Sequence, residues 1–240
     1  MLSLPVASAR AATLFVGESR GAFGAPTVDP SIDSEATFRV ENPSPQTEDF
    51  LLGEPGQDSA PNRLSFTGQG FSVLSEQTFS VGSLTYRNGQ TFEGTNVSSV
   101  PLGISLDLIQ PLQAQRSFEY SFTFNLTPNT AQGGSADSLV ISENPAPQTL
   151  LIQDKTFSIE LLGFSADDGN TFVSSFQIPE DQSVSSTLFA QITPVPGDVG
   201  SPVETPNGQP TRVPEPAILP SLLALGAVVR IKRNLLPAQR

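Results

Sequence analysis

The strictest alternation of apolar and polar residues in this chain runs from Phe118 to Leu126. Every even-numbered position there is apolar and every odd-numbered position is polar. Residues 102–108 alternate in the same way, with leucine or isoleucine at each even position. A period of two places successive side chains on opposite faces of a strand. We therefore predict two antiparallel strands, each with one buried and one solvated face, joined by a loop over residues 109–117.

A tight hairpin is expected after the alternating residues 78–86. Asn88-Gly89 follows this stretch, and this dipeptide favours the two left-handed positions of a type I′ turn. The return strand would then start at residues 91–92.

The remaining chain predicts more short strands, separated by turns rich in Gly, Pro, Asn and Asp. No strand alternates with a helical segment, which argues against an α/β architecture. The pattern predicts an all-β protein with a single antiparallel β-sandwich, jelly-roll-like, over residues 13–193. The further predicted strands are 37–41, 63–66, 70–74, 138–142, 156–163, 171–176 and 185–192.

The sequence changes character after this region. Residues 194–212 are rich in Pro and Gly and predict an extended linker. The triplet Pro214, Glu215 and Pro216 follows, and the apolar segment 217–229 comes next. This segment predicts one short hydrophobic helix about 20 Å long, against a bilayer core of about 30 Å. A basic cluster ends it: Arg230, Lys232 and Arg233.

This order of linker, Pro-Glu-Pro triplet, apolar segment and basic stop resembles the PEP-CTERM sorting signal, here residues 213–240. The resemblance implies that Pro214, Glu215 and Pro216 are recognised by an exosortase, a membrane-bound processing enzyme. It also implies contact with the membrane through the C-terminal segment, and a basic cluster that stays on the cytoplasmic side. The family is associated with bacteria that make exopolysaccharide, which implies a location at the cell envelope, on the surface or in the extracellular matrix.

The N-terminal residues 1–12 contain small-x-small triplets, Ala7-Ser8-Ala9 and Ala9-Arg10-Ala11. Such triplets are typical of secretory cleavage sites. We expect residues 1–12 to be the remnant of a signal peptide whose start lies upstream of Met1. A disordered terminus is the alternative.

The amino-acid composition limits the kinds of catalysis, metal binding and partner that are expected of the chain. The chain contains no cysteine and no histidine, which excludes thiolate catalysis, zinc–sulfur sites and the commonest general base. Residues 1–211 carry 7 basic and 23 acidic side chains. An acidic surface repels phosphate backbones, so no nucleic-acid partner is expected.

Several short phrases resemble those of the choice-of-anchor K domain, a group found beside alternative surface anchors. The resemblance extends over most of residues 20–193 and implies nothing about chemistry. The phrases are residues 63–68, 79–89, 94–95, 100–102 and 188–193.

Candidate ligands for Ca²⁺ are Asp167, Asp168, Asn170 and Asp181, because oxygen ligands on a glycine turn suit this ion. Their spacing does not match an EF-hand loop, and a plain Asp/Asn/Gly turn is the alternative. The acids at 48, 49 and 54 are expected in a solvated loop.

A carboxylate-only glycoside hydrolase needs two acids about 5–10 Å apart across a cleft. Asp107 and Glu119 are the candidate pair, although polar positions of a sheet are ordinarily solvated. The prediction is therefore an exported, non-enzymatic structural or binding protein. A Ca²⁺-dependent carbohydrate or matrix-binding module and the hydrolase remain as alternatives.

Overall fold

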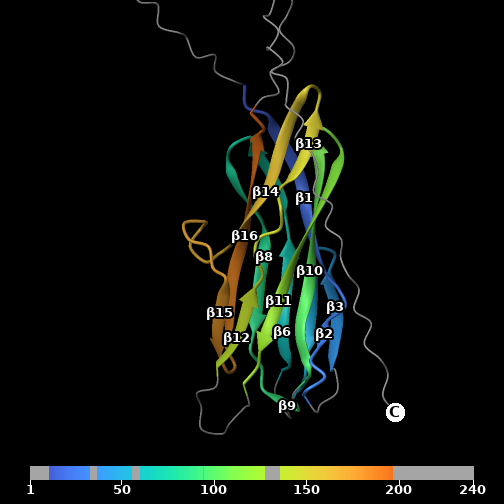
Figure 1. Cartoon of the computed structure of the whole chain (residues 1–240), viewed down its shortest axis with the longest axis vertical. Helices are drawn as coiled ribbons and strands as arrows, with labels where there is room; N and C mark the ends of the chain where they lie inside the picture. Colours follow the sequence, from blue (N-terminus) through green and yellow to red (C-terminus); the bar gives the residue numbers. More distant parts are fainter. Residues whose placement is uncertain (1–10, 33–36, 56–59, 94, 128–135, 197–240) are drawn as a thin grey trace, which may run out of the picture. The chain divides into compact units, whose positions relative to one another are not determined.

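The computed structural model describes residues 11–32, 37–55, 60–93, 95–127 and 136–196 (Figure 1). Within these ranges the protein consists of strands that form two curled antiparallel sheets and a small two-stranded ribbon. The expected all-β, sandwich-like class is therefore confirmed. Residues 197–212 of the predicted linker, the hydrophobic segment and residues 1–10 lie outside the described residues. The predicted start of the linker at residue 194 is wrong, because Pro194 ends the strand β16 (Ser183–Pro194) and the Val195 N–H donates to the carbonyl of Thr156.

The first sheet has the strand order β15-β12-β11-β10-β1-β7, and β2 also pairs with β10. The second sheet has the order β13-β14-β16-β8-β6-β4-β3, and β5 pairs with β9. The first sheet contains β1 (Leu14–Phe23), β2 (Thr27–Val28), β7 (Gly70–Leu74), β10 (Val97–Gln110), β11 (Ala114–Asn125), β12 (Ala136–Ile141) and β15 (Ser175–Pro179). The second contains β3 (Phe38–Ser44), β4 (Thr47–Leu52), β6 (Asn62–Gly68), β8 (Thr78–Arg87), β13 (Gln148–Ile152), β14 (Lys155–Ser165) and β16 (Ser183–Pro194). The ribbon is β5 (Glu54–Pro55) and β9 (Thr91–Glu93).

Phenylalanine rings join the two sheets across the core. Phe50 of β4 stacks on Phe124 of β11, with ring centroids 6.2 Å apart, and Phe15 of β1 meets Phe157 of β14 edge-on at 5.2 Å. All four side chains are buried. Each ring brings a large apolar area to the core and no polar atom that needs a partner.

The predicted antiparallel pair is confirmed as β10 and β11. Leu102 lies opposite Tyr120 and Ile104 opposite Phe118, and all four side chains are buried. Both strands run further than predicted, so only residues 111–113 connect them.

The hairpin predicted at Asn88-Gly89 is wrong. Neither residue has a positive φ, and β9 pairs with β5 instead of returning along β8. The side chain of Asn88 is fully buried, and its backbone N–H donates to the carbonyl of Gln182. Gly89 passes so close to the chain at Ala60 that an added Cβ would lie 2.0 Å from that carbonyl oxygen. The glycine is needed for close approach, not for a left-handed turn.

Two other expectations need correction. The strand predicted over residues 171–176 starts at Ser175, because Thr171 belongs to a turn that is hydrogen-bonded to Asp167. The acids at 48 and 49 are not in a solvated loop. Both lie in β4, and Asp49 is 5% exposed, 3.7 Å from the Arg63 guanidinium.

The domain's two ends meet at one pole, which we call the terminal pole and define by Thr13, Ser75, Thr156 and Val195. The backbone N–H of Ser75 donates to the carbonyl of Thr13, and that of Val195 donates to the carbonyl of Thr156. The opposite, far pole is defined by β9 and the turn at residues 180–182 (Figure 1).

Candidate functional site

A buried polar cluster lies between the sheets near the far pole. We define the Asp137 cluster as Asn62 of β6, Tyr86 of β8, Asp137 of β12, and Thr127. Asp137 Oδ2 accepts hydrogen bonds from the Tyr86 hydroxyl and the Asn62 amide, both at 3.4 Å. Asp137 Oδ1 accepts from the Thr127 backbone N–H at 2.8 Å and from its hydroxyl at 3.1 Å. Asp137 is only 2% exposed, so the cluster joins the two sheets from inside.

Burial controls the titration of this cluster. Loss of hydration raises the pKa of Asp137, and the hydrogen bonds from Thr127, Tyr86 and Asn62 act in the opposite direction. Burial also raises the pKa of Tyr86 beyond the ordinary value for a phenol, and the Asp137 carboxyl adds to this effect. A tyrosine that keeps its proton is a permanent donor to the carboxyl group.

Asn88 extends the polar cluster toward the far pole. Its Nδ2 donates to the carbonyl of Ile178 in β15 at 2.8 Å, and the Gly89 N–H donates to Asn62 Oδ1 at 2.6 Å. These bonds connect the end of β8 to strands of both sheets. The buried cluster therefore has a structural role in fixing how the sheets meet.

Asp137 was missed in the sequence, although a signal was present. It shares the odd-numbered phase of Leu139 and Ile141, the buried positions of β12. An acid in phase with buried apolar residues indicates an interior carboxyl group that needs donors.

Of the predicted calcium ligands, Asp167, Asp168 and Asn170 lie in one turn, and Asp181 lies in another. Asp167 Oδ1 accepts from the Ser165 hydroxyl at 2.7 Å and the Thr171 N–H at 2.8 Å. Its Oδ2 accepts from the Thr171 hydroxyl at 2.7 Å. The bond from Ser165, followed by those from Thr171, lowers the pKa of Asp167. This carboxylate already has internal donors that close its own loop.

The other three candidates occupy turn positions. Asp168 has a φ of 57°, and Asn170 donates from Nδ2 to the Asp167 carbonyl. Asp181 lies in the turn before β16, where it accepts from Gln90 Nε2 at 2.7 Å. Residue 165 lies opposite residue 187 of β16, so at least four strand residues, about 13 Å, separate Asp181 from the Asp167 loop. Among the residues that the structure describes, no three acidic side chains are grouped to hold a metal ion.

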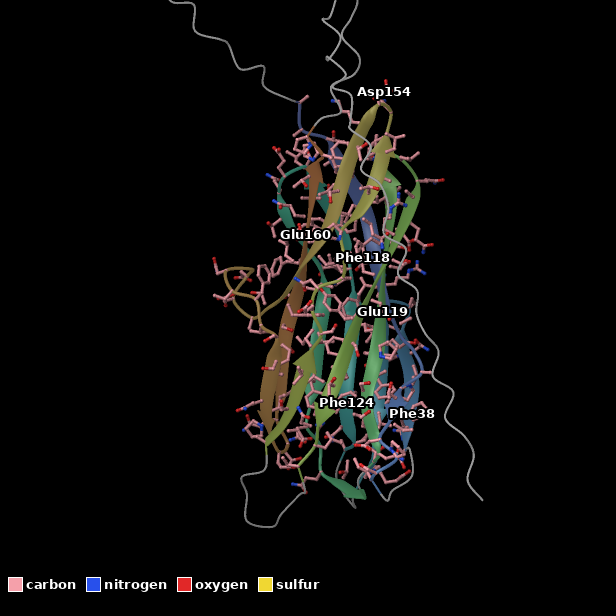
Figure 2. All side chains as sticks on the ribbon, in the orientation of Figure 1. Phe38, Phe118, Glu119, Phe124, Asp154 and Glu160 are labelled. Carbon is pink, nitrogen blue, oxygen red and sulfur yellow. The ribbon has the colours of Figure 1, made fainter. Side chains whose placement is uncertain are left out.

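The candidate hydrolase pair is also separated. Asp107 lies opposite Gln115, whereas Glu119 lies opposite Gly103. Four residues of offset correspond to about 13 Å along the strands, beyond the separation that glycoside hydrolysis needs. Glu119 is exposed on the face of β11 opposite to that of the buried Phe118 (Figure 2).

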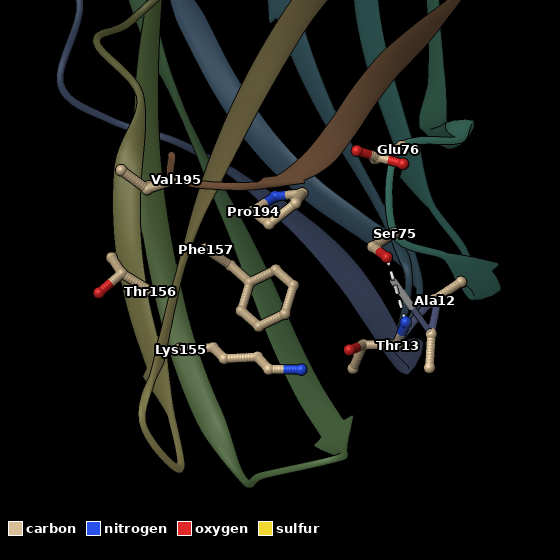
Figure 3. Close-up of a pocket in the computed structure, with 10 residues that line it drawn as sticks. Ala12, Thr13, Ser75, Glu76, Lys155, Thr156, Phe157, Pro194 and Val195 are labelled. Carbon is tan, nitrogen blue, oxygen red and sulfur yellow. Dashed lines mark hydrogen bonds between the residues drawn. The ribbon is translucent and has the colours of Figure 1, made fainter. Parts of the chain in front are cut away.

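A small cavity of about 60 Å³ lies at the terminal pole (Figure 3). Its walls include Phe157, Lys155 and Glu76, and the Thr13 N–H donates to the Ser75 hydroxyl at 3.1 Å beside it. This volume is enough for one or a few waters and too small for a substrate of ordinary size.

A larger groove of about 250 Å³ lies between the end of β12 and the Asp167 loop. Phe164 forms its buried floor, and Phe172 stands at the rim with 45% of its surface exposed. Asn144 crosses it, accepting from the Tyr120 hydroxyl at 3.0 Å and donating to the Leu162 carbonyl at 2.9 Å. Both ends of that amide are therefore occupied by bonds to β11 and β14.

The predicted sorting residues Pro214, Glu215 and Pro216 lie outside the described residues, as do Arg230, Lys232 and Arg233. In the part of the chain that the structure describes, no helix is long and apolar enough to cross a membrane. In comparisons with known proteins, the chain matches no family model and no curated protein.

Proposed function

We propose that this protein is an exported, non-enzymatic β-sandwich of the bacterial cell surface or extracellular matrix, sorted by its C-terminal PEP-CTERM-like signal. In this proposal residues 197–212 form the linker, and residues 217–229 form a short membrane-associated helix. An exosortase-type enzyme recognises Pro214, Glu215 and Pro216. The folded domain, jelly-roll-like and similar to choice-of-anchor K domains, is the exported part.

The observation that carries this proposal is the meeting of both domain ends at the terminal pole. Val195 pairs with Thr156, and Thr13 pairs with Ser75 at the same end of the sandwich. The chain therefore leaves the domain at the pole where it entered, and the proposed sorting signal follows directly. Termini that lie close together at the surface are typical of domains that are joined to other segments.

The interior chemistry supports a structural or binding role. The carboxyl group of Asp137, buried at the centre of the Asp137 cluster, accepts hydrogen bonds from Tyr86 and Asn62 of the other sheet and from Thr127. The two acids considered for hydrolysis are offset by about 13 Å along the strands, beyond the separation that glycoside hydrolysis needs. The acidic surface keeps such a domain soluble and apart from anionic polymers.

Fractionation of the native host tests the proposal. An epitope tag is placed between Gly200 and Ser201, and the chain is compared with a variant in which Pro214-Glu215-Pro216 is replaced by three alanines. Thr205-Pro206-Asn207, replaced in the same way, is the matched control within the linker.

We expect the wild type and the linker control to be shortened and to occur in the envelope or medium. The triplet variant should stay full length in the membrane fraction. If all three chains remain full length in the cytoplasm, the proposal fails.

A further inference from the structure

The strand β3 forms one edge of the second sheet. All seven of its residues, Phe38–Ser44, are exposed, and among the described strands it pairs only with β4. Phe38 marks this edge in Figure 2. An unpaired edge offers a row of backbone donors and acceptors to another strand.

The register with β4 shows which backbone groups are available. The Thr37 carbonyl accepts from the Gly53 N–H at 3.0 Å, and Arg39 and Glu41 continue the same phase toward β4. Backbone groups alternate in direction along an antiparallel strand. The N–H and C=O groups of Phe38 and Val40 therefore point away from the sheet. The regular phase ends at Glu41, because the register with β4 shifts between Glu41 and Ser44. Neither Phe38 nor Val40 is a proline, so each provides a donor as well as an acceptor, whereas Pro43 near the end of β3 has no N–H.

The side chains of this edge are of two kinds. Phe38 and Val40 share the core-facing side, yet they remain 42% and 40% exposed. Phe38 stacks on the buried Phe50 with ring centroids 5.6 Å apart. On the other side, Arg39 and Glu41 form a salt bridge of 2.6 Å. The apolar core thus continues to the rim of the sheet, and a pair of opposite charges lies outside it.

The edge formed by β13 is covered differently. Arg116 donates from Nε and Nη2 to the carbonyl of Thr149 in β13, at 2.9 and 2.8 Å. A guanidinium group occupies that carbonyl, so this acceptor is not available to another strand. No hydrogen bond of this kind to β3 occurs among the described residues on its outer side.

We propose that β3 is an interaction surface for a second copy of this chain, paired antiparallel with Val40 opposite Val40. In this register the outward N–H and C=O groups of Val40 pair with those of Val40 of the second copy. Arg39 then faces Glu41 of the second copy, and Glu41 faces its Arg39. The charges are self-complementary about a two-fold axis, as an isologous interface requires. An unrelated strand would have to supply the same order of charges.

Sedimentation velocity of the full-length chain, in a mild non-ionic detergent and over a concentration series, tests this proposal. We expect a monomer–dimer equilibrium for the wild type. Arg39→Glu and Glu41→Arg should each raise the dimer dissociation constant about tenfold or more, because like charges then face each other. The double variant, with both charges exchanged, should return it close to the wild-type value.

Arg20→Glu is the matched control, since Arg20 and Glu18 form the same kind of pair on β1, a strand with neighbours on both sides. It should leave the equilibrium unchanged. Val40→Pro should abolish the dimer and keep the fold, because the lost N–H points away from β4.

Cross-linking reports the register independently. The chain has no cysteine, and directly opposed residues of a hydrogen-bonded pair lie at a Cα distance of about 5.5 Å, within disulfide range. Val40→Cys should form a disulfide-linked dimer under mild oxidation, and Leu151→Cys, exposed on β13, should not. A wild type that stays monomeric at all concentrations overturns the proposal. So does a dimer that survives Val40→Pro, or equal cross-linking of the two cysteine variants.

Discussion

The hydroxyl group of Tyr86 in β8 donates a hydrogen bond at 3.4 Å to Oδ2 of Asp137 in β12, and so connects the two sheets through the interior. Both side chains are almost completely buried. A buried carboxyl group without donors would be costly, and this one has donors from β6, β8 and the residue Thr127. The cluster is therefore part of what specifies how one sheet sits on the other.

Replacing Tyr86 by phenylalanine should lower the free energy of unfolding by about 1–2 kcal/mol, because a buried acceptor loses one donor. Chemical denaturation monitored by fluorescence or circular dichroism measures this loss. Tyr120→Phe is the comparison, since that hydroxyl bonds to the neutral amide of Asn144. Equal stability of wild type and Tyr86→Phe would show that the hydroxyl does not hold the cluster.

Asp137 should make the stability fall as the pH rises. Burial raises the pKa of Asp137 in the folded state, so the unfolded chain releases this proton first. Protonated Asp137 contributes its full stability below the pKa that it has in the unfolded chain, about 3.9. This contribution is lost as the pH rises through the pKa that it has in the folded state. The free energy of unfolding of Asp137→Asn, minus that of the wild type, should therefore increase from pH 4 to pH 7 in parallel denaturation series. A constant difference would contradict the raised pKa.

Gly89→Ala should be strongly destabilising. A Cβ at this position would lie 2.0 Å from the Ala60 carbonyl oxygen. The backbone at residue 89 cannot move away without breaking the hydrogen bond from its N–H to Asn62 Oδ1. We expect a loss of about 2 kcal/mol or more, measured by thermal or chemical denaturation. Gly103→Ala is the control, because its Cβ would meet nothing closer than 3.6 Å. Similar stability for both variants would refute the close approach.

Calcium should not change the melting temperature. Both oxygens of Asp167 accept hydrogen bonds from Ser165 and Thr171, and Asp181 belongs to a different turn. Differential scanning calorimetry with excess Ca²⁺ and with EDTA should give superimposable melting curves. A melting temperature that rises with Ca²⁺ and falls with EDTA would restore the calcium-site hypothesis.

Strands with regular alternation were predictable, and strands without it were not. The period of two located β10 and β11 and even their pairing, because one face of each is buried. The long strand β1 was missed, since its glycines and charged residues dilute the apolar signal. In β4 the buried run from Asp49 to Leu52 has no alternation at all. Asp49 lies within this run, and an acidic residue there indicates a solvated loop. The sequence does not show that the Arg63 guanidinium lies beside its carboxylate.

By itself, the sequence determined the all-β class and most strand positions, because alternation and turn residues act locally. It also carries the motif evidence for the sorting signal, since residues 213–240 lie outside the part of the chain that the structure describes. Only the tertiary structure decided that Asn88-Gly89 is not a hairpin turn and that the buried Asn88 side chain bonds to β15. It likewise separated the candidate acids, joined Asp137 to Tyr86, and left β3 at an edge with its apolar side uncovered. Each of these depends on contacts between residues distant in the chain, and no local pattern contains that information.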